Sequence, residues 1–120
     1  MKLVLLTFAS QEGAARWDAM TSEARRADIE RHREWFREHG AAVVGGEELA
    51  PPHRTWTVRR IEGRSHSTEG PHEPSRDWLS GIIVVEAEDV GAAIAMAAEW
   101  PGLDYPGHFI EVRPIDETPA

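Results

Sequence analysis

The chain has 120 residues, of which 41% are hydrophobic, and this length supports one folded domain with a single core. It contains no cysteine, and this excludes disulfide scaffolds, thiolate zinc sites, iron–sulfur clusters and cysteine nucleophiles. The formal net charge of −8 argues against binding to nucleic acid or to an anionic membrane surface, because both select a positive face.

The first predicted element is a strand over residues Lys2–Phe8. Its Val and Leu content is typical of a strand that is buried on both faces at the centre of a sheet. The apolar run is too short for a signal peptide or a membrane span. We therefore expect a soluble cytoplasmic protein.

A helix is predicted after a stretch of small and polar residues in which no element is expected. Thr21 or Ser22 can cap its N-terminus, and it runs to about His39. Gly40 is expected to end it in the left-handed conformation. One stripe at helical spacing is mostly apolar and consists of Arg25, Ile29, His32 and Phe36, with Trp35 beside it. The helix is therefore amphipathic, with a histidine inside its apolar face.

The rest of the chain alternates strands with one more helix. Further strands are predicted over residues 41–46, 81–86 and 109–113, and the glycine pair that ends the first favours a bulge or a close backbone approach. Alternation over residues 55–61 and a turn at Glu62-Gly63 predict a hairpin with a weaker strand over residues 65–68. Asp89 caps a helix that ends before Pro101. The segment Glu69–Asp77 holds two prolines and a glycine, so it is predicted to be a loop.

This order of elements predicts an α+β fold, a ferredoxin-like sandwich with an antiparallel sheet and two helices on one face. We expect one domain over residues 1–115 and a frayed acidic tail over residues 116–120. The other face of such a sheet is bare, and a second copy of the chain would cover it. We therefore expect a homodimer, with a pocket between sheet and helix or at the seam between subunits.

Several segments of the chain resemble the YCII-related family, in particular its branch with a DGPF motif. The segments are Gly46–Pro52, Thr55–Arg59, Glu69–His72, Ala92–Pro101 and Glu111–Pro114. The resemblance implies a dimeric α+β barrel, in which two ferredoxin-like sheets close on each other. For function it implies less, since most members have no assigned activity and a few act as cofactor-free lyases or dehalogenating enzymes on small aromatic compounds. A histidine–aspartate pair is the proposed active centre in the shorter branch.

The chain departs from the family pattern at its functional positions. The Asp-Gly-Pro-Phe motif stands here as Glu69–His72, with a longer acid and a titratable ring. Arg76 and Asp77 keep a basic–acidic pair in the run that follows. The aspartate that precedes proline in the shorter branch is Trp100 here, so half of the proposed dyad is missing.

His32 is the first catalytic candidate. Asp28 precedes it by one helical turn, and a carboxylate at this spacing can fix the imidazole tautomer and support an imidazolium, as a general base requires. The alternative is a core histidine that is satisfied by one hydrogen bond, or a histidine that is half exposed at the edge of the stripe.

The loop after residue 68 is the second candidate, because a loop stiffened by proline can aim catalytic groups. It contains Glu69, His72 and Arg76, with Trp78 adjacent. The alternative is a solvated connection whose charges face water.

Metal and nucleotide chemistry find little support in the residue spacing. A metal set would use His66, Glu69, His72 and His108, which match no standard zinc or iron signature. No phosphate loop or dinucleotide fingerprint occurs. We expect no metal and no cofactor.

Five tryptophans are many for this length, and Trp35 and Trp78 adjoin the two candidate sites, where they could bind a flat ligand. The alternative, favoured for Trp56 and Trp100 in particular, is that tryptophans fill the core and the dimer seam.

Together these features predict a cofactor-independent enzyme that moves a proton on an apolar cyclic or aromatic substrate, as a lyase, isomerase or cyclase. His32 would be the base, oriented by Asp28, and Glu69 or His72 would be the acid. Arg76 would hold an anionic oxygen. The alternative is a non-catalytic dimeric module that binds a small ligand or a protein partner, or that acts in regulation.

Overall fold

The computed structural model describes residues 1–117 of the chain. Its elements follow one another as β1 (Lys2–Ser10), α1 (Gln11–Ala19), α2 (Ser22–His39), β2 (Val43–Glu48), β3 (Trp56–Ile61), β4 (Arg64–Glu69), β5 (Asp77–Glu86), α3 (Val90–Ala98) and β6 (Phe109–Pro114). Two short 3-10 segments lie at Pro52–Arg54 and Pro101–Asp104. Residues 118–120 of the expected acidic tail lie outside the described part.

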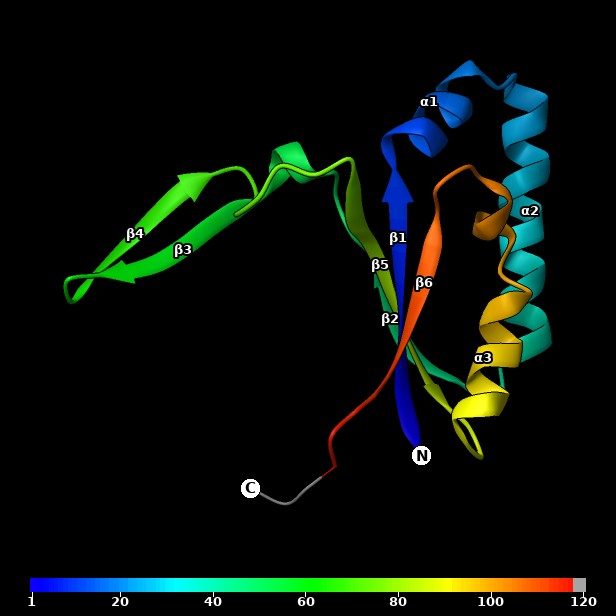
Figure 1. Ribbon diagram of the computed structural model, residues 1–120. Helices are drawn as coiled ribbons and strands as arrows, with labels where there is room; N and C mark the ends of the chain where they lie inside the picture. The colour runs from blue at the N-terminus through cyan, green and yellow to red at the C-terminus, as the bar shows by residue number, and fades with distance from the viewer. Residues whose placement is uncertain (118–120) are drawn as a thin grey trace.

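The main sheet has the strand order β2-β5-β1-β6, and every neighbouring pair is antiparallel. Helices α2 and α3 lie on the same side of this sheet (Figure 1). This is the predicted ferredoxin-like α+β sandwich, and β1 is central in it as the sequence indicated.

The core lies between the helices and one face of the sheet. Leu3 and Leu5 of β1 are fully buried there, together with Val85 of β5. Trp35 reaches this core from α2, and its Nε1 donates a hydrogen bond to the Met96 carbonyl at 3.0 Å. The hydrogen bond and the ring area together fasten α2 to α3.

The opposite face of the sheet is apolar but carries no helix within residues 1–117. Val4 and Leu6 point to this face by strand alternation, opposite Val84 and Ile82 of β5, and are half-buried. Phe8 and Phe109 stack there with ring centroids 4.7 Å apart. The prediction that β1 is buried on both faces is therefore wrong for the single chain.

Helix α1 was not predicted, because its nine residues are small or polar apart from Trp17 and give no apolar stripe. Ser10 supplies its cap, since its Oγ accepts a hydrogen bond from Gly13 N at 2.9 Å and donates one to the Pro106 carbonyl at 2.5 Å. Arg25 of α2 closes the other end by donating to the Trp17 carbonyl at 2.9 Å. Long-range bonds thus hold a helix that local propensity does not predict.

Helix α2 begins at its predicted cap, where Thr21 Oγ1 accepts from Ala24 N at 3.1 Å. The prediction for Gly40 is wrong, because its φ of −55° and ψ of −32° are right-handed helical values. The apolar stripe does not enter the core, since Ile29 is 41% and Phe36 39% exposed. The core contact comes from Trp35 instead, and the stripe faces a cavity.

The remaining predicted elements are present with shifted ends. Strand β2 starts two residues later than expected and has a register shift between Val43 and Gly45, where a bulge was predicted. Strand β5 starts four residues earlier than expected, so Trp78 lies in a strand. Asp89 caps α3 as predicted, with Oδ1 accepting from Ala92 N at 2.8 Å.

The predicted hairpin is present, but β3 and β4 form a two-stranded sheet of their own. Figure 1 shows this hairpin projecting away from the main sheet. Trp56 at its start is 62% exposed, so the expectation that it fills the core is wrong for the single chain.

Candidate functional site

A cavity of about 900 Å³ lies on the helix side of the main sheet. Strands β2 and β5 form its floor, α1 and α2 form two of its walls, and the segment after α3 closes a third side. Helix α2 packs most closely on the segment Pro101–Asp104, and the cavity lies between this helix and strands β2 and β5. A volume of this size fits a small-molecule ligand.

Glycines keep the floor of the cavity flat. Gly46 has a φ of 157°, and a Cβ atom there would lie 2.6 Å from the Ile82 carbonyl oxygen. A Cβ atom at Gly81 would lie 2.9 Å from Thr7 Oγ1. Both glycines line the cavity without a side chain, so a planar molecule can approach the backbone closely here.

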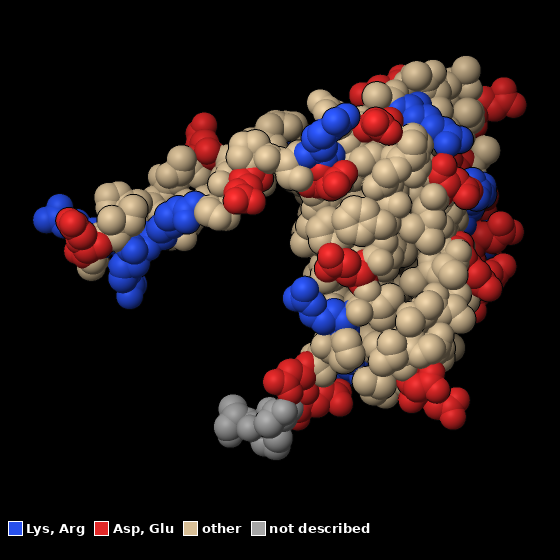
Figure 2. Space-filling model, viewed as in Figure 1, with Lys and Arg blue, Asp and Glu red and all other residues tan. Residues whose placement is uncertain are grey.

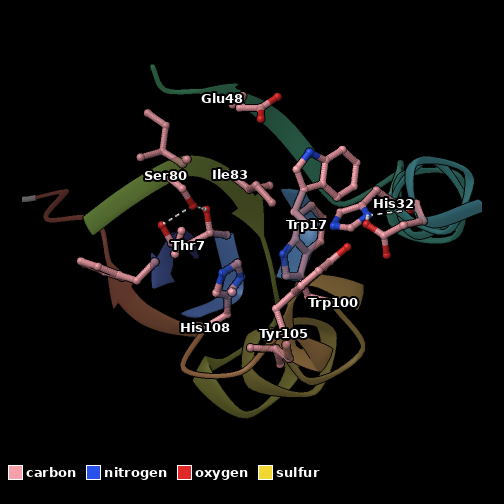
Figure 3. Close-up of a pocket in the computed structure, with 18 of the residues that line it drawn as sticks. Thr7, Trp17, His32, Glu48, Ser80, Ile83, Trp100, Tyr105 and His108 are labelled. Atoms are coloured by element: carbon pink, nitrogen blue, oxygen red, sulfur yellow. Dashed lines mark hydrogen bonds and ion pairs between the residues drawn. The ribbon is translucent and has the colours of Figure 1, made fainter. Parts of the chain in front are cut away.

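Aromatic rings line one side of the cavity. Figure 3 shows Trp17 and Trp100 beside His32 on this side, with Thr7, Ser80 and His108 opposite. Trp100 stands edge-on to His32, with ring centroids 4.8 Å apart and an interplanar angle of 88°. Trp100 stands where the shorter branch of the family has an aspartate, so that position adjoins the candidate base His32.

The His32 ring is held by the backbone of its own helix. Its Nδ1 lies 2.8 Å from the Asp28 carbonyl oxygen and 3.4 Å from Asp28 Oδ2. A carbonyl oxygen only accepts, so Nδ1 carries the proton of the neutral ring and Nε2 is left as the basic nitrogen. The side chain is 26% exposed and lines the cavity.

Asp28 is the buried charge beside this histidine, with a relative exposure of 7%. Its Oδ1 lies 3.6 Å from Arg31 Nη1, which partly balances the carboxylate. The pKa of Tyr105 is raised to about 12, first by burial and then by a hydrogen bond with Asp28 and by the negative charge of that carboxylate. The phenol of Tyr105 is therefore neutral at physiological pH.

A pair of hydroxyl groups lies on the opposite side of the cavity. Ser80 Oγ donates to the Thr7 carbonyl at 3.0 Å and lies 3.1 Å from Thr7 Oγ1. Because Ser80 has one proton to donate, Thr7 must be the donor in the hydroxyl pair. Thr7 Oγ1 thus keeps its lone pairs available as acceptors.

His108 also lines the cavity, although the sequence suggested it only as a metal ligand. Burial lowers the pKa of His108, while a backbone hydrogen bond with Gly102 and the charge of Asp77 act in the opposite direction. Its Nε2 is buried without a hydrogen-bond partner in residues 1–117. A Cβ atom at Gly13 would lie 2.1 Å from that nitrogen, so the unpredicted helix α1 makes the room for this ring.

The two tryptophans that were predicted to bind substrate, Trp35 and Trp78, do not line the cavity. Trp35 is 3% exposed and belongs to the core. Trp78 pairs with Ala9 near the start of β5 and is half-buried. The rings that do line the cavity are Trp17, which the sequence did not connect with a site, and Trp100, which it connected only through the missing aspartate of the family.

The predicted loop site lies apart from the cavity of its own chain. None of Glu69, His72 and Arg76 lines it. His72 Nδ1 accepts a hydrogen bond from Arg59 Nη2 of β3. Arg76 lies 3.7 Å from Glu12 Oε1, and its carbonyl accepts from Gln11 N at 2.8 Å. The loop is therefore tied to β3 and α1 rather than to His32.

One group of metal-ligating side chains comes together within residues 1–117, and it is a different one from the set considered in the sequence. Glu38, His39 and Glu99 offer ligand atoms within 4.8 Å of one another. His39 Nε2 already lies 2.9 Å from Glu99 Oε2, so a direct hydrogen bond accounts for this proximity.

The four-stranded antiparallel sheet, its two covering helices and the cavity beneath them define an α+β protein of ferredoxin-like fold. Within that class, the chain belongs to the YCII-related domain family, which matches residues 1–117. The family resemblance read from the sequence is confirmed, whereas the finer DGPF assignment stays a prediction.

A solved structure shares this fold. The chain is similar to 5-chloro-2-hydroxyhydroquinone dehydrochlorinase (TftG) from Burkholderia phenoliruptrix AC1100, in complex with 2,5-dihydroxybenzoquinone. The TM-score is 0.50 at 11% sequence identity, over 92% of this chain and 91% of that chain.

No curated protein sequence matches the chain. In residues 1–117 no helix is both long and apolar enough to cross a membrane.

Proposed function

We propose that the chain is a small-molecule enzyme that transfers a proton without a cofactor, with His32 as the base. The observation that carries the proposal is the His32 ring, whose Nδ1 is occupied by the Asp28 carbonyl 2.8 Å away while the side chain lines the cavity. A fixed tautomer with a free Nε2 is what a general base needs.

The proposed substrate is a planar cyclic or aromatic compound. Glycines at positions 46 and 81 flatten the floor, and the indoles of Trp17 and Trp100 offer stacking surfaces. The ligand named with the fold neighbour, 2,5-dihydroxybenzoquinone, is a planar ring of this kind and supports the proposal. We propose a substrate with an acidic C–H bond beside a carbonyl group.

In the proposed step, Nε2 of His32 removes the proton from carbon and the electron pair of the C–H bond moves into the ring as an enolate. In an isomerisation, the imidazolium of His32 then returns the proton to a different atom of the substrate, so one histidine serves as base and acid. In an elimination, the enolate instead expels a leaving group from the substrate. Asp28 stabilises the imidazolium from 3.4 Å. Arg33 lines the cavity and is proposed to hold the enolate oxygen.

The roles first assigned to Glu69, His72 and Arg76 need a different arrangement. None of them lines the cavity of its own chain, so we propose these roles only for a cavity to which a second copy brings its loop. We also propose that two copies form a homodimer through the uncovered sheet face of Val4 and Leu6.

The substitution His32→Gln tests the catalytic proposal. Glutamine keeps a polar side chain but cannot shuttle a proton, so we expect kcat/KM on hydroxylated quinones and chlorinated hydroquinones to fall by about 10²–10⁴-fold. The affinity for 2,5-dihydroxybenzoquinone, read from tryptophan fluorescence, should change little. His53→Gln, at an exposed histidine outside the cavity, is the control.

Three outcomes would separate the hypotheses. Loss of turnover with retained binding supports the enzyme. Binding without turnover in the unsubstituted chain favours the non-catalytic ligand-binding module. Equal turnover in both variants would remove His32 from the mechanism.

A further inference from the structure

The β3–β4 hairpin, which we call the arm (residues 53–72), leaves the body of the molecule as a separate sheet. Figure 1 shows it reaching outward at an angle to the main sheet. A hairpin of two strands is at best marginally stable in water by itself. An arm with this regular register over six residue pairs therefore calls for a surface to pack against.

One side of the arm exposes two large apolar side chains. Trp56 and Val58 lie on the same side of β3 by strand alternation and are 62% and 69% exposed. Near the tip, Ile61 is 50% exposed, but it lies on the other side of β3. Large apolar side chains grouped in this way mark a contact surface rather than the scattered exposure that is normal for soluble proteins.

The arm and the rest of the chain carry opposite charges. Residues 53–72 contain four arginines and two glutamates, which gives the arm a net charge of +2. The whole chain has a net charge of −8, so the residues outside the arm carry −10. Figure 2 shows arginines grouped along the arm and many acidic side chains over the body. The arm is thus electrostatically complementary to the body of another copy.

The arm also borders an uncovered apolar surface. Figures 1 and 2 show an open angle between the arm and the main sheet, on the side away from the helices. The sheet wall of this angle includes Val4, Leu6 and Ile82, which no helix within residues 1–117 covers. An object that filled the angle would cover both apolar surfaces at once.

We propose that this object is a second copy of the chain, and that each arm clasps the body of its partner with the Trp56–Val58 side inward. One chain carries both halves of the contact, a basic apolar arm and an acidic body with an apolar face. Two copies can therefore satisfy both halves reciprocally about a two-fold axis. This clasp goes beyond the proposed reaction and beyond packing of one sheet on another.

The test combines the double substitution W56S/V58S with hydrogen–deuterium exchange and light scattering on the purified full chain. Wild-type β3–β4 amides should be protected at micromolar concentration and lose protection on dilution, in step with the fall in mass from dimer to monomer. W56S/V58S should weaken the dimer by about tenfold or more and leave the arm amides unprotected. Ile94→Ser, at an apolar residue of α3 that is 53% exposed, is the matched control and should change neither readout.

Several results would overturn the clasp. A dimer whose arm amides exchange rapidly would show that sheet packing alone joins the copies. A monomer at all concentrations would remove the second copy as the occupant, and arm protection that does not depend on concentration would show that the arm is stable by itself. The His32→Gln assay is independent of these readouts, so failure of the clasp and failure of the proposed reaction can be told apart.

Discussion

The surroundings of His32 and of His72 differ although the sequence marked both as candidate sites. His32 is one-quarter exposed, with its Nδ1 bonded to the Asp28 carbonyl and an indole edge-on to its ring. His72 is exposed and contacts Arg59 of the hairpin to which its loop is attached. Prolines can stiffen a loop, but a cavity requires walls from several elements, and only His32 has them.

The largest effect is expected for Trp35→Ala, which removes a ring from the core that supports the His32 cavity. We expect the free energy of unfolding to fall by about 3–5 kcal/mol, because the side chain is 3% exposed and loses its bond to the Met96 carbonyl. Urea denaturation measures the change. Ile94→Ala should stay within about 0.5 kcal/mol, and a Trp35→Ala chain as stable as wild type would contradict this account of the core.

The floor of the cavity is tested by Gly81→Val. The new Cβ would lie 2.9 Å from Thr7 Oγ1, and the rest of the side chain would occupy the cavity. We expect a stability cost of about 1–3 kcal/mol and a clear loss of affinity for 2,5-dihydroxybenzoquinone. Gly63→Val offers a contrast in the hairpin turn, because nothing lies within 4 Å of a Cβ there and only the positive φ of 78° is strained. It should leave ligand binding unchanged.

Tyr105 allows a direct measurement, since it is the only tyrosine in the chain. Its pKa is raised to about 12 by burial and by Asp28, so phenolate absorbance should appear well above pH 10. The folded chain keeps the proton longer than the unfolded chain, whose tyrosine has a pKa of about 10. The stabilising contribution is therefore complete below pH 10 and is lost as the pH rises through 12. Tyr105→Phe should remove this part of the alkaline loss, and an ordinary tyrosine titration would show that the Asp28 side of the cavity is open to water.

The smallest effect is expected for His72→Gln. An exposed side chain at the end of the hairpin contributes little to folding, so the free energy of unfolding should change by less than about 0.5 kcal/mol. Ligand affinity should also be unchanged if the loop stays with its own chain. A loss of turnover comparable to that of His32→Gln would instead show that a partner's loop enters the cavity.

Elements that depend on local chemistry were predictable from the sequence. Thr21 and Asp89 cap their helices as expected, and the alternation of residues 55–61 correctly predicted a hairpin strand. Proximity of His32 to Asp28 was also predictable, because one helical turn separates them. In each case the partners are within a few residues of each other.

Features built from distant segments were not predictable in the same way. Helix α1 depends on Ser10 bonding to Pro106, and His108 depends on the absence of a side chain at Gly13. The separation of the loop from the cavity follows from the direction in which the hairpin leaves the body (Figure 1). No periodicity within a single segment reports such contacts.

The sequence alone determined the order of the elements, the antiparallel ferredoxin-like sheet and the pairing of a histidine with a carboxylate on α2. Hydrophobic alternation, helix caps and i,i+4 spacing carry that information within short stretches of chain. Only the tertiary structure decided which aromatic rings surround His32, which face of the sheet stays open and where the arm points. These depend on how helices pack over strands that are far apart in the sequence, since only packing determines which side chains meet and which spaces stay empty.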